Sequence, residues 1–421
     1  MSQTNLQQQL CTAESTEEQS AVLKNTQAFC PMPWVHLHVY TDGKVTPCCS
    51  NFLHYGRVNE QSPTAIFNGR PIRAFRLRML EDKKEKRCQS CYQIEAAGGK
   101  SIRQDTIERY AGQLSELIQN TDEKGTLKGG TPLFYDLRTS NQCNLRCRTC
   151  YHGNSSKWFK EAELLGRTAA PQAKISAFEK ISCADYIAET LPGVEEFYFA
   201  GGEPLMMEEH WQILDQLIAM KKFNTLLRYN TNLSTLQYKG RNIIPLWQQF
   251  DHLALGISID AFGAAGEYIR KDLRWSKFME NIQTIKTLLP NAVLRFEPTV
   301  SLLNIFRLTA DHQQAIDQGW ISPNAWHLNI LQRPDLFSIQ TLPAEQKRQV
   351  ETQIRTFLDR SESLLNNRTK EAYEGVIAFM KQADLSSYLP AFQQEIIQLD
   401  QLRKESWADE LPELSVLMPA D

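Results

Sequence analysis

Residues 133–150, LFYDLRTSNQCNLRCRTC, are the strongest indication of the fold. The first six of them are apolar enough for a short buried strand. Three cysteines follow at once, Cys143, Cys147 and Cys150, with the spacing C-x3-C-x2-C. Three thiolates on one tight loop can hold three irons of a cubane cluster and leave the fourth iron open to a small molecule. The alternatives are a structural zinc site, with His152 as the candidate fourth ligand, and plain core cysteines.

Downstream of this loop, short apolar segments alternate with helix-length intervals. The segment 206–221 is amphipathic and predicts one of the intervening helices. Alternating strands and helices imply parallel βα units, so we expect an α/β fold whose chemistry lies on loops at the carboxyl ends of the strands. The expected strands are 133–138, 195–200, 225–230, 253–259, 292–300 and 325–331.

The second expected strand is followed by Gly201-Gly202-Glu203-Pro204. Alone, this motif predicts a strand-to-helix turn. Together with the cysteine loop one βα unit earlier, it resembles the radical S-adenosylmethionine superfamily over about residues 133–331. The resemblance implies a partial (β/α)6 TIM-like barrel, expected over 132–335, a catalytic 4Fe-4S cluster on the three cysteines, and S-adenosylmethionine bound with its amino group at Glu203.

The resemblance also implies further cofactor contacts at strand ends. Ser258 and Asp260 match positions that bind the ribose, Arg270 matches a partner for the cofactor carboxylate, and Asn230 ends the third strand. Tyr151, directly after the last cysteine, is the nearest aromatic candidate. For each residue, a turn or helix cap is the alternative interpretation. The implied reaction is reductive cleavage of the cofactor to a radical that takes hydrogen from a substrate, and it requires a low-potential donor such as flavodoxin or ferredoxin.

A second cysteine set precedes this region. Cys30 and Cys48 flank an expected hairpin with its turn at Asp42-Gly43, and Cys88-x2-Cys91 follows. Soft ligands of this kind suit zinc and iron–sulfur clusters equally. The spacing C-x12-G-x4-C resembles the SPASM or twitch module, which implies a second 4Fe-4S cluster in an auxiliary domain expected over 27–105.

The other metal-binding residue types receive no metal role. Cys49 either substitutes for Cys48 or stays free, and we assign no function to Cys11 or Cys183. His36 and His38 share one face of a strand, where a solvated or hydrogen-bonded pair is the favoured interpretation.

The remaining segments complete the predicted organisation. Residues 1–26 are polar and predict a mobile tail, and 106–131 predict a helix and a linker. Residues 336–421 predict a C-terminal helical extension. Its expected helices are 343–364, 370–382 and 389–404.

Composition limits the function further. The chain has 421 residues and a net charge of −3, which disfavours nucleic-acid binding. No secretory signal or membrane span is evident, so we expect a cytoplasmic protein. A peptide or protein side chain is the first expectation for the substrate, and a sugar or a small-molecule cofactor precursor is the alternative. A zinc-binding or redox-sensing protein without radical chemistry is the competing class.

Overall fold

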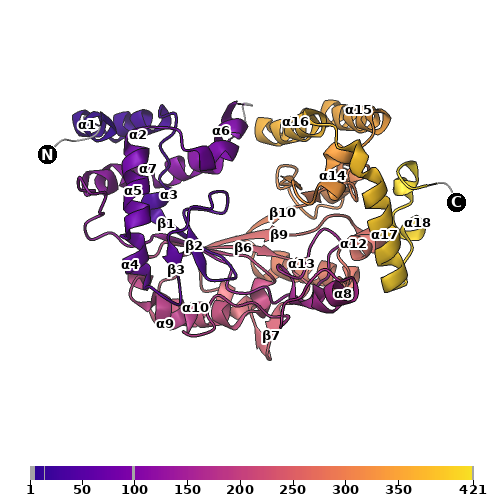
Figure 1. Cartoon of the computed structure of the whole chain (residues 1–421), viewed down its shortest axis with the longest axis horizontal. Coiled ribbons are helices and arrows are strands. Elements are labelled where there is room, and N and C mark those ends of the chain that lie inside the picture. Colours follow the sequence, from indigo (N-terminus) through magenta and orange to yellow (C-terminus); the bar gives the residue numbers. More distant parts are fainter. Residues whose placement is uncertain (1–4, 14, 97–99, 420–421) are drawn as a thin grey trace. The chain divides into compact units, whose positions relative to one another are not determined.

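The computed structural model describes residues 5–13, 15–96 and 100–419. Its contacts divide the chain into two compact units. The first comprises residues 1–142, 174–228 and 249–252, and the second comprises residues 143–173, 229–248 and 253–421. Both contain helices and strands, in agreement with the predicted α/β class (Figure 1).

The first unit contains a mixed sheet with the strand order β5-β4-β1-β2-β3. Strands β1 (His36–Val39), β4 (Phe134–Leu137) and β5 (Glu196–Phe199) are parallel. Strands β2 (Lys44–Thr46) and β3 (Gly56–Arg57) are antiparallel additions at the β1 side. The cysteine-rich hairpin β1–β2 is therefore joined to β4, the strand that leads into the three-cysteine loop.

The two faces of this sheet differ in polarity. Leu37, Tyr135 and Phe197 share one face and are fully or nearly fully buried. Helix α10 (Glu208–Ala219) covers part of this face, since the rings of Phe199 and His210 are 4.8 Å apart. The opposite face carries ionisable residues, which are described with the site below.

Helices α1 (Asn5–Thr12) and α2 (Thr16–Lys24) occupy part of the segment that the sequence predicts as a mobile tail. Leu6, Leu10 and Leu23 are buried. The prediction missed these helices because each has only one or two buried leucines among polar residues. The other helical segments of this unit are α3 (Met32–Val35), α4 (Pro63–Phe67), α5 (Arg70–Leu80), η1 (Lys86–Cys88), α6 (Gln89–Ala96), α7 (Ile102–Gln119), α9 (Cys183–Ala188), η3 (Leu191–Gly193) and η4 (Pro204–Met206).

Strand β6 (Leu226–Thr231) begins in the first unit and ends in the second. In the second unit, β9 (His252–Ile257) pairs in parallel with β10 (Val293–Phe296). The predicted strand 292–300 is divided into β10 and β11 (Thr299–Val300) around Pro298, which has no N–H for a strand ladder. Strand β11 pairs with β12 (Asn329–Ile330), and β7 (Gln237–Tyr238) with β8 (Arg241–Asn242).

The C-terminal region is helical, as the sequence predicts. Helices α15 (Ala344–Arg360), α16 (Asn367–Gln382) and α17 (Leu389–Arg403) match the three expected segments closely. The other helical segments of the second unit are η2 (Ser156–Trp158), α8 (Phe159–Leu164), α11 (Ile244–Trp247), α12 (Gly263–Ile269), α13 (Trp275–Leu288), α14 (Leu308–Asp317), η5 (Asp335–Phe337), η6 (Ile339–Thr341), η7 (Ser386–Tyr388), α18 (Trp407–Glu410) and η8 (Pro412–Val416).

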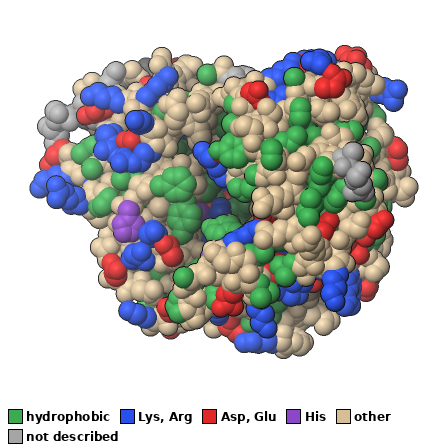
Figure 2. All heavy atoms as spheres, turned by 45° about the vertical axis from the view of Figure 1, so that its right-hand side comes forward, with side chains coloured by type: hydrophobic (Ala, Val, Ile, Leu, Met, Phe, Trp, Pro, Cys, Tyr) green, Lys and Arg blue, Asp and Glu red, His purple; other side chains and the backbone are tan. Residues whose placement is uncertain are grey.

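Surface charge is mixed. Figure 2 shows Lys and Arg side chains interspersed with Asp and Glu over the face it draws, as the small net charge leads one to expect. Within the described ranges, no helix is at once long and apolar enough to traverse a lipid bilayer.

Candidate functional site

The three-cysteine loop of the second unit is held by backbone pairing. The N–H groups of Arg146 and Arg148 donate to the carbonyls of Lys271 (3.0 Å) and Ile269 (2.8 Å). This pattern places Cys147 directly opposite Arg270, with both side chains on the same face. The Trp158 indole N–H also donates to the Cys147 carbonyl at 2.8 Å. These three hydrogen bonds fix the backbone of the loop around Cys147.

Polar groups surround the cysteine sulfurs. The Asn232 amide nitrogen lies 3.8 Å from Cys143 Sγ, and the Arg270 guanidinium lies 4.0 Å from Cys147 Sγ. Burial raises the pKa of the Cys150 thiol, and the neighbouring Cys147 and Cys143 add to the effect. The three sulfurs are thus close enough to interact electrostatically. Protons must leave them before they can bind iron.

Arg270 and Asp260 form a mutual ion pair. Arg270 Nε lies 2.9 Å from one carboxylate oxygen of Asp260 and Nη2 lies 3.0 Å from the other. Asp260 also accepts the Thr299 N–H at 2.8 Å. The sequence assigned these two residues to separate cofactor groups, whereas the structure brings them together beside Cys147.

The other predicted cofactor residues of this unit lie at strand ends or on the cysteine loop. Ser258 follows β9, and its N–H donates to the carbonyl of Thr231, the last residue of β6. The Asn230 side chain lies against Gly256 of β9, where an added Cβ would meet its amide oxygen at 2.7 Å. Tyr151 is 55% exposed, so its ring is accessible.

In the first unit, the Gly201–Pro204 motif is packed against the chain that enters the cysteine loop. Gly201 has φ +109°, and an added Cβ would lie 3.1 Å from the Ser140 carbonyl oxygen. The Glu203 N–H donates to the Gln142 carbonyl at 2.7 Å, and Gln142 directly precedes Cys143 in the chain. The motif needs its glycines because backbone approaches backbone there.

Sequence reasoning missed the residues that form ion pairs with the arginines of the cysteine loop. Arg148 has a fully buried side chain, 2.6 Å from Asp400 and 2.7 Å from Glu405. Its guanidinium also lies over the Tyr268 ring, 3.6 Å from the ring centre. Asp400 is on α17, so the C-terminal helical region stabilises the loop.

Arg146 is also held by ion pairs. It pairs with Glu161 at 2.6 Å and with Asp272 at 2.8 Å. Arg403, the last residue of α17, also pairs with Glu161 (2.7 Å) and donates to the Arg146 carbonyl (2.9 Å). The sequence signal was present, since arginines flank Cys147 on both sides, but their carboxylate partners are more than ten residues away in the chain.

The auxiliary cysteines form a second cluster of thiols within the first unit. Burial raises the pKa of the Cys30 thiol, and Cys88 and Cys91 raise it further. Burial likewise raises the pKa of Cys48, with added contributions from Cys49, Cys30 and Cys91. The Asn51 amide donates to Cys88 Sγ at 3.2 Å, a hydrogen bond of the kind that tunes cluster potentials. Each of the four predicted ligands is therefore close enough to interact with at least two of the others.

Within the described part of the chain, no three Cys, His, Asp or Glu side chains are arranged as ligands of a single metal ion. In a cubane cluster, each thiolate binds a different iron, so its cysteines need not converge on one point. Both cysteine sets supply thiols in close association, which is the donor chemistry that iron–sulfur clusters use.

The histidine pair has polar partners, as predicted. His38 Nδ1 lies 2.7 Å from Asp136, and His36 Nδ1 lies 2.8 Å from the Pro47 carbonyl oxygen. Burial alone would raise the pKa of Asp136, but the charges of His38 and Arg138 outweigh burial and lower it. The strand β4 that leads to the cysteine loop thus carries a buried carboxylate in its charged form.

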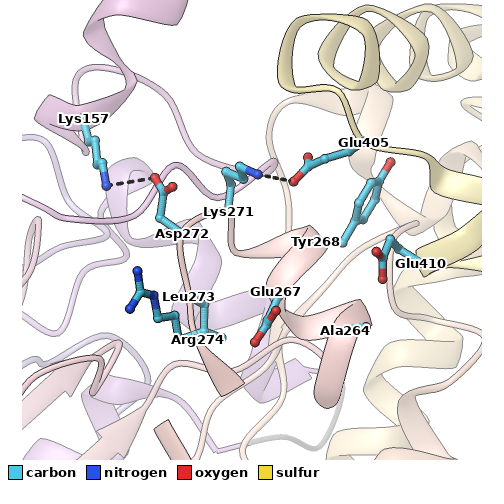
Figure 3. A pocket seen from close by; sticks show the side chains of 10 residues that line it. All are labelled: Lys157, Ala264, Glu267, Tyr268, Lys271, Asp272, Leu273, Arg274, Glu405 and Glu410. Atoms are coloured by element: carbon cyan, nitrogen blue, oxygen red, sulfur yellow. Dashed lines mark hydrogen bonds and ion pairs between the residues drawn. The ribbon is translucent and has the colours of Figure 1, made fainter. Parts of the chain in front are cut away.

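A pocket of about 320 Å³ lies in the second unit (Figure 3). It is lined by charged side chains, among them Lys271 and Asp272, and includes the ion pairs Lys157–Asp272 and Lys271–Glu405. No cysteine lines it. This pocket is therefore distinct from the cysteine site.

Residues 30–92 match the SPASM family, described as an iron-sulfur cluster-binding domain. The match spans all four predicted auxiliary ligands, and it confirms the prediction of an iron–sulfur module in this segment. Residues 30–92 therefore form a segment similar to iron–sulfur cluster-binding domains of the SPASM family.

Similar solved structures include native anSMEcpe with bound AdoMet, at 13% identity and a TM-score of 0.39, covering 54% of this chain and 61% of that chain. They also include SuiB from Streptococcus suis bound to S-adenosylmethionine, at 12% identity and a TM-score of 0.35, covering 69% of this chain and 64% of that chain. The chain thus spans just over three fifths of the length of either structure. No curated protein matches it in sequence.

Proposed function

We propose that this protein is a radical S-adenosylmethionine enzyme with one auxiliary iron–sulfur cluster, and that it modifies a peptide or protein side chain. The observation that carries the proposal is the pairing of 146–148 with 269–271. It sets the central cysteine of a C-x3-C-x2-C loop beside the Arg270–Asp260 pair at the carboxyl end of a strand. Sites for small ligands in parallel sheets lie at such strand ends.

The cysteines have separate roles in this proposal. Cys143, Cys147 and Cys150 hold the catalytic cluster, and Cys30, Cys48, Cys88 and Cys91 hold the auxiliary one. A reduced cluster held by Cys143, Cys147 and Cys150 would supply one electron for the reductive cleavage of S-adenosylmethionine, with methionine as the leaving group.

The polar residues bind and orient the cofactor. Glu203 accepts from its amino group, with Gly201, Gly202 and Pro204 shaping the turn. Arg270 supports the Cys147 thiolate and the cofactor carboxylate from the position that Asp260 fixes. Asn230, Ser258 and Tyr151 supply the remaining contacts.

The proposal of a peptide substrate is suggested by the ligands of the similar solved structures. SuiB is known bound to the precursor peptide SuiA, and anSMEcpe bound to AdoMet and the Cp18Cys peptide. A flavodoxin or ferredoxin in the cytoplasm is the proposed electron donor, because cluster potentials at the low end of their range require one.

The test is anaerobic reconstitution with iron and sulfide, followed by reduction with dithionite in the presence of S-adenosylmethionine. We expect a brown protein with about eight irons that releases 5′-deoxyadenosine. Cys147→Ala should abolish this release, and Cys88→Ala should leave it partly intact with about half the iron. Cys183→Ala, at a buried cysteine in α9 outside both sets, is the matched control.

Two results would contradict the proposal. One is a colourless protein that retains zinc after anaerobic purification, which would support the zinc-binding class. The other is 5′-deoxyadenosine release that persists in Cys147→Ala at the unmodified rate.

A further inference from the structure

The polar face of the first-unit sheet carries a row of ionisable side chains. The parallel register aligns His38 of β1 with Asp136 of β4 and Tyr198 of β5. Because alternate residues of a strand share a face, Tyr40 and Arg138 form the next row towards the carboxyl ends of the strands. Ligand sites of parallel sheets lie at this edge.

The Arg138 side chain contacts the buried Asp136 and is itself partly exposed to solvent. Its Nε lies 3.4 Å from Asp136 Oδ1, and His38 holds the other Asp136 oxygen at 2.7 Å. The side chains of His38 and Asp136 are 0% and 5% exposed, whereas that of Arg138 is 30% exposed. Within the described ranges, Asp136 is the only side chain hydrogen-bonded to this guanidinium, and both terminal nitrogens remain available.

Two neighbouring segments of the first unit lie close to Arg138. An added Cβ at Gly201 would lie 3.3 Å from the Arg138 Cα, so the Gly201–Pro204 turn packs against this residue. The Tyr40 hydroxyl donates to the carbonyl of Cys49, the neighbour of Cys48, at 3.4 Å. Arg138 thus lies between the proposed cofactor turn and the auxiliary cysteines.

The rings of Tyr40 and Phe52, called the Tyr40–Phe52 shelf below, adjoin the same edge. The rings of Tyr40 and Phe52 are stacked at 6.3 Å, and Phe52 is 74% exposed. Because most of the Phe52 ring is exposed, an apolar part of a ligand could contact it. A guanidinium fork next to an aromatic ring is suited to a carboxylate attached to an apolar group.

We propose that Arg138, oriented by the buried Asp136–His38 pair, binds a carboxylate of the substrate at the carboxyl edge of this sheet. This inference rests on the proposed function, because it names the substrate group that the same enzyme recognises. S-Adenosylmethionine also carries a carboxylate and is the other source of that chemistry. Its proposed partner is Arg270, which leaves Arg138 for the substrate.

The experiment uses reconstituted holoenzyme and phenylacetate as the probe, since phenylacetate joins a carboxylate to a ring that fits the Tyr40–Phe52 shelf. Phenylacetamide is the neutral control of the same shape. Binding is measured by ligand-observed NMR, and S-adenosylmethionine binding is measured separately by equilibrium dialysis. We expect phenylacetate to bind about tenfold more tightly than phenylacetamide.

Substitution then assigns the interaction. Arg138→Gln should remove the tenfold preference while S-adenosylmethionine binding changes less than about twofold. Arg138→Lys keeps a positive charge for Asp136 but loses the fork, so it should fold and retain part of the preference. Arg355→Gln, on the exposed face of α15, should change neither measurement.

Equal binding of the two probes, or a preference that survives Arg138→Gln, would overturn the proposal. So would an equal loss of S-adenosylmethionine binding, which would assign Arg138 to the cofactor. Release of 5′-deoxyadenosine in the absence of substrate is measured alongside. Its absence from the unmodified enzyme would refute the proposed function, while the probe measurement would still report on Arg138.

Discussion

The buried pair Arg148–Asp400 offers a sharp test of how the cysteine loop is held. Arg148→Met would leave Asp400 without its charged partner, and removal of one member of a buried pair costs about 3–5 kcal/mol. Asp400 would keep hydrogen bonds from the Tyr268 hydroxyl (2.8 Å) and the Trp407 N–H (2.7 Å). Glu405 would keep Lys271 at 2.5 Å. We therefore expect Arg148→Met to lower the free energy of unfolding by about 3 kcal/mol, the low end of this range.

The assay is urea unfolding of the metal-free protein followed by tryptophan fluorescence. For a slope of about 3 kcal/mol per molar urea, the unfolding midpoint should fall by about 1 M. Adding Asp400→Asn to Arg148→Met should recover most of the loss, because it removes the unpaired charge. Arg355→Met breaks an exposed pair and should leave the unfolding midpoint nearly unchanged. A loss below about 1 kcal/mol for Arg148→Met, or no recovery in the double variant, would refute this reasoning.

Three further predictions concern other parts of the molecule. Gly201→Ala should lower stability by about 1–3 kcal/mol because of its positive φ and close backbone neighbours, whereas Gly112→Ala, in α7 with open space around it, should raise stability by about 0.5–1 kcal/mol; thermal unfolding measures both. Burial lowers the pKa of His312 from 6.5 to about 4, so the unfolded chain takes up a proton between these values that the folded chain does not. Stability should therefore fall by up to about 3 kcal/mol as pH drops from 6.5 to 4, and unfolding of His312→Gln should lack this component. Asn51→Ala removes an amide that donates to Cys88 Sγ, and this hydrogen bond favours the reduced auxiliary cluster because the reduced form is more negative. Spectroelectrochemistry should therefore show the reduction potential of the auxiliary cluster lowered by about 40 mV.

Local sequence patterns were sufficient for the C-terminal helices and for the positions along the chain of several strands from Phe134 onward. The apolar spacing of 344–360 and 389–403 predicts helices that the structure contains. The cysteine spacing predicts both thiol groups and the iron–sulfur module, which the family match confirms for residues 30–92.

Contacts between distant segments were not predictable in this way. Nothing local to Arg146 or Arg148 indicates that they pair with 269–271, and nothing local to Arg148 indicates Asp400 as its partner. Ion pairs of this kind depend on which surfaces the packed helices bring together. The mutual pair of Arg270 and Asp260 is a further case, since the sequence suggested a separate partner for each.

The parallel ladder between β1 and β4 has a consequence for how this chain can be taken apart. The cysteine-rich module is not an independent domain, because its first strand pairs with the strand that precedes the three-cysteine loop. Excising residues 30–92 would leave β4 as an open edge with Asp136 deprived of His38. Such a module is poorly suited to transfer between proteins as a separate unit. Any rearrangement that moves it to another position in the chain must preserve the pairing of β1 with β4.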